Sequence, residues 1–130
     1  MKVIDGKGAI LGRLASYVAK ELLKGEKIAI VNSDQIIISG NKKSLKIHYE
    51  ERTRRGGHGF LGPKYSMTTE KVVKRTIRGM IHEHRWGRGK EVLKNVRCYK
   101  GIPKEFENEK KIIAGKGKPI KYIEVREITK

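Results

Sequence analysis

Apolar residues recur in pairs every four positions between residues 9 and 24, and this spacing places them on one face of a helix. The paired positions are Ile10, Leu11, Leu14, Ala15, Val18, Ala19, Leu22 and Leu23. Gly25 follows the last pair and is a natural stop for a helix. A helix is therefore predicted over residues 9–24.

Two short apolar runs flank this helix. Residues 2–5 end at Gly6, and residues 27–31 are rich in Ile and Val and precede the turn residues 32–34. A strand, a helix and a strand within about thirty residues form a βαβ unit, which joins two parallel strands through a right-handed crossover. The pattern thus predicts an α/β fold with a parallel pair of strands.

The pattern predicts further elements downstream, each bounded by turn or capping residues. A helix over residues 69–82 starts near Thr68 or Thr69, which are both good N-caps. The other expected elements are a strand at 35–39, a helix at about 42–54, a short helix at 88–96, a strand at 97–99 and a possible late strand at 122–125. No internal repeat or second-domain linker interrupts this order, so we expect a single domain over residues 1–130.

Residues 54–66 do not fit a regular element. They are rich in glycine and cations and contain Pro63, a composition that does not hold a helix or a central strand. We expect a basic loop here and a charged tail over about residues 104–130. Two interpretations of the loop stay open: a disordered linker, or a segment whose glycines let the backbone approach a phosphate.

Composition limits the class of protein. A chain of 130 residues is long enough for one domain with its own core. The one cysteine, Cys98, excludes an internal disulfide and agrees with a reducing cytosol. The apolar runs are too short to cross a bilayer, and the N-terminal residues lack the apolar run of a signal peptide. We therefore expect a soluble cytoplasmic protein.

The positive charge is concentrated in the middle of the chain. The net charge is +17, and residues 41–104 supply +13 of it, whereas each flank carries only +2. A one-sided excess of this size is typical of a surface that binds a polyanion. An acidic protein or an anionic membrane are the other partners to consider, but a membrane-binding helix needs Trp, Phe or Leu on its apolar face, and this chain has its Trp and Phe among glycines and charges. Nucleic acid is the favoured partner, and the flanks are expected to form the scaffold.

The helix at 69–82 places like charges above one another. Lys71 precedes Arg75 by four residues and Lys74 precedes Arg78, and such pairs destabilise an isolated helix by a few tenths of a kcal/mol each. Binding of this helix face to phosphates would offset the destabilisation. The alternative interpretation is a basic face that only contacts solvent. Downstream, Trp86 lies among cations and is expected either to stack on an unpaired RNA base or to cap the edge of the core.

Signs of catalysis are weak. The glycines at 6, 8 and 12 follow a strand and precede a helix, but their spacing matches neither a P-loop nor a dinucleotide-binding turn. His82, His84 and Cys98 are too few for a structural zinc site. We expect no catalytic residue, cofactor, metal or small-molecule substrate, with a small α/β enzyme acting on a phosphorylated ligand as the competing class.

Several motifs in order resemble one family. They are Ile10–Ser16, Ala19-Lys20, Leu22-Leu23-x-Gly25, Val31-Asn32, Ile38–Asn41, Gly62-Pro63-Lys64, Arg78–Ile81, Arg88-Gly89-Lys90 and Val96-x-x-Tyr99-x-Gly101-Ile102-Pro103. Together they resemble the L13 family of large-subunit ribosomal proteins, in its archaeal type. The family usually has proline where this chain has His82, so the helix at 69–82 is expected to continue towards Trp86.

The resemblance implies a three-layer α/β/α domain around a four-stranded, mostly parallel sheet. It implies a structural constituent of the large ribosomal subunit that binds large-subunit ribosomal RNA, supports early assembly, contacts neighbouring ribosomal proteins and is no enzyme. An RNA-binding translational regulator outside the ribosome is the alternative function. The residues expected to contact RNA, from charge and from the resemblance, are Arg13, Lys42, Lys43, Arg52, Arg54, Arg55, His58, Lys64, Lys71, Lys74, Arg75, Arg78, Arg85, Trp86, Arg88 and Lys90.

Overall fold

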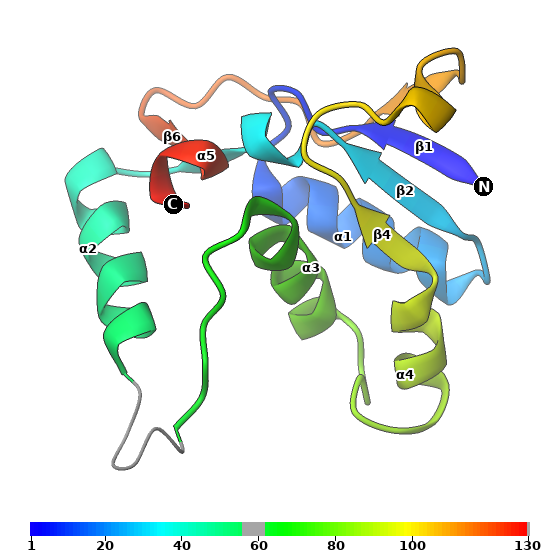
Figure 1. Ribbon diagram of the computed structural model, residues 1–130, viewed down its shortest axis with the longest axis horizontal. Coiled ribbons are helices and arrows are strands. Elements are labelled where there is room, and N and C mark those ends of the chain that lie inside the picture. The colour runs from blue at the N-terminus through cyan, green and yellow to red at the C-terminus, as the bar shows by residue number, and fades with distance from the viewer. Residues whose placement is uncertain (56–61, 130) are drawn as a thin grey trace.

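A four-stranded parallel sheet forms the centre of the protein. The computed structural model describes residues 1–55 and 62–129 (Figure 1). The strands are β1 (Lys2–Asp5), β2 (Ile28–Val31), β4 (Val96–Cys98) and β5 (Lys111–Ile113), in the order β4-β2-β1-β5. Each neighbouring pair is parallel, with Ile4 aligned with both Ile30 and Ile112. The predicted α/β class and parallel four-stranded sheet are confirmed.

The N-terminal βαβ unit is also confirmed. Helix α1 (Leu11–Leu23) connects β1 to β2 and buries the apolar face that its spacing predicts. It starts two residues later than expected because Ala9 and Ile10 bridge to other segments. It ends at Leu23, one residue before the predicted end, and Gly25 follows as the expected stop. The φ of 94° at Gly25 suits glycine, and its N–H donates to the carbonyl of Leu22.

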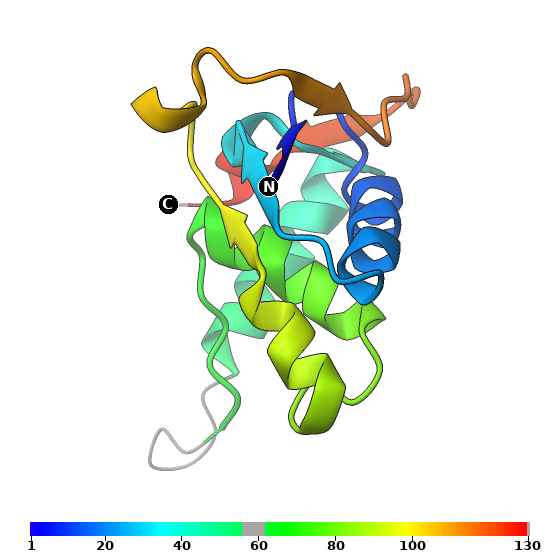
Figure 2. The same ribbon diagram turned by 90° about the vertical axis from the view of Figure 1, so that its right-hand side faces the viewer.

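The two faces of the sheet are covered unequally, as Figure 2 shows edge-on. Helices α1, α3 (Thr69–Met80) and α4 (Gly87–Lys94) pack on one face, where Ile4, Ile28 and Ile30 join their apolar side chains in the main core. The other face is covered over β1 and β2 by the 3-10 helix η3 (Lys104–Phe106), with Phe106 buried. The face of the sheet that is covered by three helices is therefore also the face that carries the cationic motifs.

A small antiparallel ribbon extends the molecule beyond the sheet. It pairs β3 (Ile37–Ser39) with β6 (Tyr122–Glu124), and the 3-10 helix η1 (Ser33–Gln35) and helix α5 (Val125–Ile128) flank it. Ile123, Val125 and Ile128 are buried. The predicted late strand at 122–125 is confirmed up to its last residue. The strand expected at 35–39 is shorter, because Gln35 belongs to η1, and it lies in this ribbon rather than in the main sheet.

Helix α2 (Lys42–Arg54) projects from the body of the molecule (Figure 1). It has no buried residue, and its N-terminus is capped by Asn41, whose side-chain oxygen accepts a hydrogen bond from the N–H of Lys43 at 3.0 Å. Its bounds agree with the prediction. The chain returns from α2 to α3 through residues 62–68, which have no regular structure.

Helix α3 ends earlier than expected. The prediction that it continues past His82 is wrong, because Ile81 leaves the helix with an extended backbone and buries its side chain in the core. Glu83 then adopts a φ of 54°, and the chain turns into α4.

Strand β5 was not predicted at all. No helix in the described residues is long and apolar enough to cross a membrane.

Candidate nucleic-acid interface

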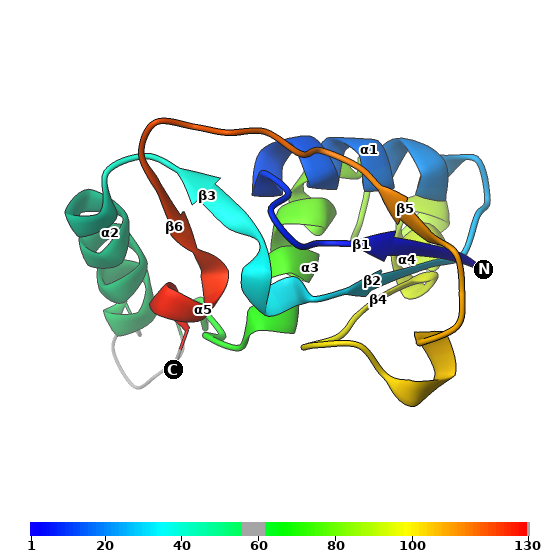
Figure 3. The ribbon, with the colours of Figure 1, turned by 90° about the horizontal axis from the view of Figure 1, so that it is seen from above.

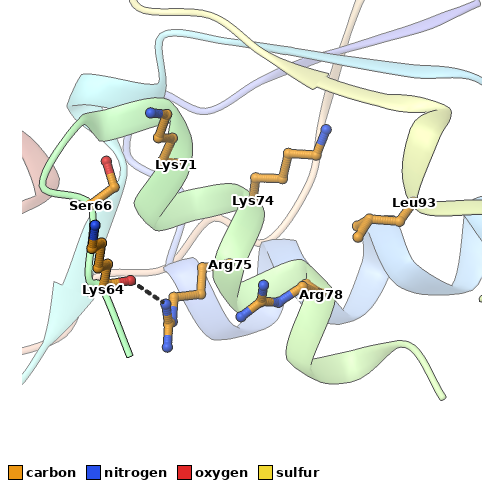
Figure 4. Close-up of a pocket in the computed structure, with 7 residues that line it drawn as sticks. All are labelled: Lys64, Ser66, Lys71, Lys74, Arg75, Arg78 and Leu93. Atoms are coloured by element: carbon orange, nitrogen blue, oxygen red, sulfur yellow. Dashed lines mark hydrogen bonds between the residues drawn. The ribbon is translucent and has the colours of Figure 1, made fainter. Parts of the chain in front are cut away.

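Helix α3 separates apolar from cationic side chains. Val72, Val73 and Ile77 are buried against α1 and the sheet. The cations of the helix lie on its other side, where Figure 4 shows Lys71, Lys74, Arg75 and Arg78 in a row. Burial of the apolar face thus determines which side of the helix presents positive charge.

These cations line an open groove of about 270 Å³ together with Lys64, which lies in the segment 62–68 before α3 (Figure 4). Ser66 and Leu93 complete its lining, so the groove holds five cations and no carboxylate. None of the five takes part in an ion pair within residues 1–55 and 62–129. The groove is therefore an uncompensated positive surface, which suits a polyanion.

Tyr65 contacts two arginines, of which Arg75 lines the groove and Arg52 of α2 does not. The guanidinium carbon of Arg75 lies 3.7 Å from the centre of the Tyr65 ring. Arg52 of α2 donates from Nη1 to the Tyr65 hydroxyl at 2.8 Å and lies 5.5 Å from the same ring centre. Stacking of guanidinium groups on an aromatic ring restricts their rotamers while leaving N–H groups for a phosphate. Sequence reasoning did not single out Tyr65.

Lys74 is fixed at the other side of the groove. Its Nζ donates to the carbonyl oxygen of Val96 at 3.2 Å, which ties α3 to the first residue of β4. Cys98 lies on that strand, and burial raises the pKa of its thiol to about 12. The thiol therefore stays protonated at neutral pH, which makes it a poor nucleophile.

The start of α4 presents a second set of predicted residues. Trp86 is 63% exposed, and Arg85 and Lys90 are exposed near it. A side chain so exposed does not cap the core, so this alternative for Trp86 is wrong. Arg88 instead has a structural contact, because its Nη2 donates to the carbonyl oxygen of Leu23 at the end of α1, at 2.9 Å.

The remaining predicted residues lie apart from the groove. Lys42 at the start of α2 pairs with Glu127 at 3.6 Å, and Lys43, Arg54 and Arg55 are exposed on or just after the same helix. His58 lies outside the described residues. Arg13 projects from the exposed side of α1, beside Gly117.

The glycine turn between β1 and α1 is not built as a phosphate cradle. The backbone N–H groups of residues 6–10 all have partners within the protein: Gly6 donates to Val31, Gly8 to Gln35, Ala9 to Gly6 and Ile10 to Gly115, and the N–H of Lys7 donates to the Asp5 carboxylate. A phosphate-binding loop needs free N–H groups that point at the ligand. Within the described residues no group of three or more His, Cys, Asp or Glu side chains could hold a metal ion.

Comparison with known proteins gives a consistent result. The family model described as "Ribosomal protein L13" matches residues 1–105. A protein of Methanosphaera stadtmanae named "Large ribosomal subunit protein uL13" is 42% identical over 120 residues, covering 90% of this chain and 84% of that one. Proteins of the same name from Methanocaldococcus jannaschii and Caenorhabditis elegans are 41% and 40% identical, covering 100% and 86% of this chain and 96% and 56% of their own lengths.

Proposed function

The chain belongs to the ribosomal protein L13 family, and we propose that it is a structural constituent of the large ribosomal subunit that binds large-subunit ribosomal RNA through the α3 groove. The observation that carries this proposal is the set of five cations in a groove whose lining holds no carboxylate. Each phosphate that such a row neutralises releases condensed counterions into solution, which favours binding.

The mechanism is positioning of the RNA backbone on a rigid platform. Packing of α3 on the core fixes the direction of Lys71 and Arg78, and Tyr65 fixes Arg75. A cation that is already held in one conformation loses less entropy when it meets a phosphate. Contacts of this kind set the orientation of the protein on RNA and carry no sequence information of their own.

Trp86 adds a different kind of contact. Unpaired bases of RNA stack on exposed aromatic side chains, and Trp86 combines high exposure with neighbouring cations. We expect it to contact a base in a loop or bulge, next to backbone contacts made by Arg85 and Lys90.

The cellular setting follows from the same proposal. A large-subunit protein works in the cytoplasmic ribosome, contacts neighbouring ribosomal proteins and supports subunit assembly at an early step. The whole chain acts as one RNA-binding domain and catalyses no reaction, in agreement with relatives that are named as ribosomal proteins. No observation favours the alternative of a translational regulator outside the ribosome.

The salt dependence of RNA binding tests the groove. Arg75→Ala combined with Arg78→Ala should weaken binding to a large-subunit ribosomal RNA fragment. It should also make the negative slope of log K against log salt shallower by about 1.4–1.8, since each lost phosphate contact removes about 0.7–0.9 from its magnitude. Fluorescence anisotropy at several KCl concentrations measures this slope. Lys104→Ala with Lys110→Ala removes the same charge from exposed positions outside the groove and is the control. An unchanged slope in the arginine variant would contradict the groove assignment.

A sedimentation experiment tests membership of the subunit. A constituent should remain with large subunits after a wash in high salt, whereas a protein that binds them only transiently should be released. Release of the whole population would count against the proposed function.

A further inference from the structure

Two lysine-bearing loops from opposite ends of the chain meet beside the start of α1. Residues 6–8 follow β1, and residues 115–118 follow β5. The N–H of Ile10 donates to the carbonyl of Gly115 at 2.9 Å, and Ala9 forms an antiparallel bridge with Lys116. The two loops are therefore held together by backbone hydrogen bonds.

Glycines allow this close approach. A Cβ atom on Gly115 would lie 2.7 Å from the backbone nitrogen of Leu14, and the residue has a φ of 69°. A Cβ on Gly117 would lie 2.6 Å from Cδ1 of Ile10 and 3.2 Å from Nη1 of Arg13. The backbone of the second loop thus rests on the first turn of α1, which leaves its lysine side chains to point outward.

The result is a cationic surface that we call the lysine-loop surface, composed of Lys7, Arg13, Lys116 and Lys118. All four residues are exposed, and Lys7, Lys116 and Lys118 line one groove with Gly8 and Gly117. None of the four forms an ion pair in the part of the chain that the structure describes.

The nearby carboxylates are occupied elsewhere. Asp5 accepts hydrogen bonds from the side chain of Asn32 and the N–H of Lys7, and Glu124, which lines the neighbouring groove, pairs with Arg126. Asp5 keeps its negative charge, because both of these hydrogen bonds come from neutral N–H donors. With four cations near one such carboxylate, the lysine-loop surface remains net positive.

The lysine-loop surface and the α3 groove lie on opposite sides of α1. Leu14 and Val18 of α1 are buried in the core that also holds Val72, Val73 and Ile77 of α3, whereas Arg13 lies on the exposed side of α1. Figures 2 and 3 show the segment after β5 passing α1 on the side away from α3.

We infer that the lysine-loop surface is a second RNA-binding surface, so that the protein holds two separate RNA segments on opposite sides of α1. This inference rests on the proposed function, because it takes the polyanion to be RNA. It also gives a role to Arg13, the one cation expected to bind RNA that lies on α1.

The number of RNA duplexes bound per protein chain tests the inference. With a short blunt RNA duplex in excess at low salt, sedimentation velocity should find two duplexes on the unaltered protein. Lys7→Gln with Lys116→Gln and Lys118→Gln should bind one duplex, and Lys71→Gln with Lys74→Gln and Arg78→Gln should also bind one. The matched control, Lys100→Gln with Lys104→Gln and Lys110→Gln, removes three exposed lysines near η3 and should still bind two.

The outcomes separate the two claims. The second surface is refuted if the variant of Lys7, Lys116 and Lys118 still binds two duplexes. It is also refuted if the unaltered protein binds only one duplex and only the α3 variant loses it. In that second case the assignment of the α3 groove stands. If the α3 variant keeps both duplexes, the groove assignment fails instead. Circular dichroism of each variant establishes that the fold is intact.

Discussion

Tyr65 contacts Arg75 of the groove and Arg52 of α2 although it carries no charge itself. Its ring contacts Arg75 at 3.7 Å, and its hydroxyl accepts a hydrogen bond from Arg52. Because Arg52 belongs to α2 and Arg75 to α3, this side chain also connects the projecting helix to the body of the protein.

Substitutions at Tyr65 should separate these two contacts. Tyr65→Phe keeps the stacking surface for Arg75 and loses the bond to Arg52, so RNA affinity should change less than twofold. Tyr65→Leu removes the aromatic face and should weaken binding several-fold, about 1 kcal/mol, because a cation–π contact at a surface is worth about that much. Fluorescence anisotropy with the same RNA fragment measures both. Equal affinities of the Phe and Leu variants would show that stacking does not matter.

Glu21 ties α1 to β1 through charge. Its carboxylate accepts hydrogen bonds from Lys2 and Lys24 at 2.6 Å each, and these bonds lower the pKa of Glu21 from 4.5 to about 2. A carboxyl whose pKa is lowered by folding stabilises the protein fully above its unfolded pKa, and this contribution disappears as the pH falls through its folded pKa.

The stability difference between the unaltered protein and Glu21→Gln should therefore depend on pH. It should be constant above about pH 4.5 and shrink steadily towards pH 2, as measured by urea unfolding at each pH. Glu109→Gln, at an exposed position without an ion pair in the described residues, should show no such change. A difference that stays constant down to pH 2 would mean that the Glu21 bonds do not stabilise the fold.

At the scale of the elements, α4 packs closely against the turn that connects it to α3. A Cβ on Gly89, in the first turn of α4, would lie 2.3 Å from the carbonyl oxygen of His82 and 2.5 Å from that of Glu83. Both neighbours are backbone atoms, which cannot move aside without shifting the turn. Gly79 on α3 has open space at the same position.

Gly89→Ala and Gly79→Ala should consequently change stability in opposite directions. The first should destabilise the protein by about 1–3 kcal/mol through overpacking. The second should stabilise it by about 0.5–1 kcal/mol, because alanine loses less entropy than glycine in a helix. Chemical denaturation of the two variants gives the comparison, and a neutral Gly89→Ala would exclude tight packing of α4 on the turn.

Elements with long or strongly apolar patterns were predictable from the sequence. The paired apolar residues of α1 fit only the helical period. Strand β2 was predictable as a short run rich in Ile and Val that is bounded by turn residues. Strand β5 was not predicted because it has only three residues at the edge of the sheet, with Ile113 exposed. The end of α3 was predicted wrongly because burial of Ile81 overrides the local helical preference.

The candidate interface divides in the same way. The like-charge spacing of Lys71, Arg75 and Arg78 is local, so the sequence alone pointed to that face. The stacking of Tyr65 and the position of Lys7 and Lys116 in one groove depend on which segments the fold brings together. Each flank of the chain carries only +2, so charge counted along the sequence conceals the lysine-loop surface.

At the scale of the molecule, the C-terminal residues complete the core. Residues 111–129 contain β5, β6 and α5 and bury Ile123, Val125 and Ile128. Burial of one such side chain contributes about 1.5–3 kcal/mol, so losing several removes an amount comparable to the whole stability of a domain.

Truncation after Lys110 should therefore abolish cooperative unfolding, as followed by circular dichroism during heating. Ile120→Ser is the control in the same segment, because Ile120 is 99% exposed and its replacement should change stability by less than about 0.5 kcal/mol. A sharp thermal transition in the truncated chain would show that residues 1–110 fold alone.

The position of β1 in the sheet has a consequence for synthesis of the chain. This first strand is paired on one side by β2 and on the other by β5, more than one hundred residues later. A nascent chain therefore exposes one unpaired edge of β1 until almost its last residues have left the ribosome, and unpaired edges invite association with other chains.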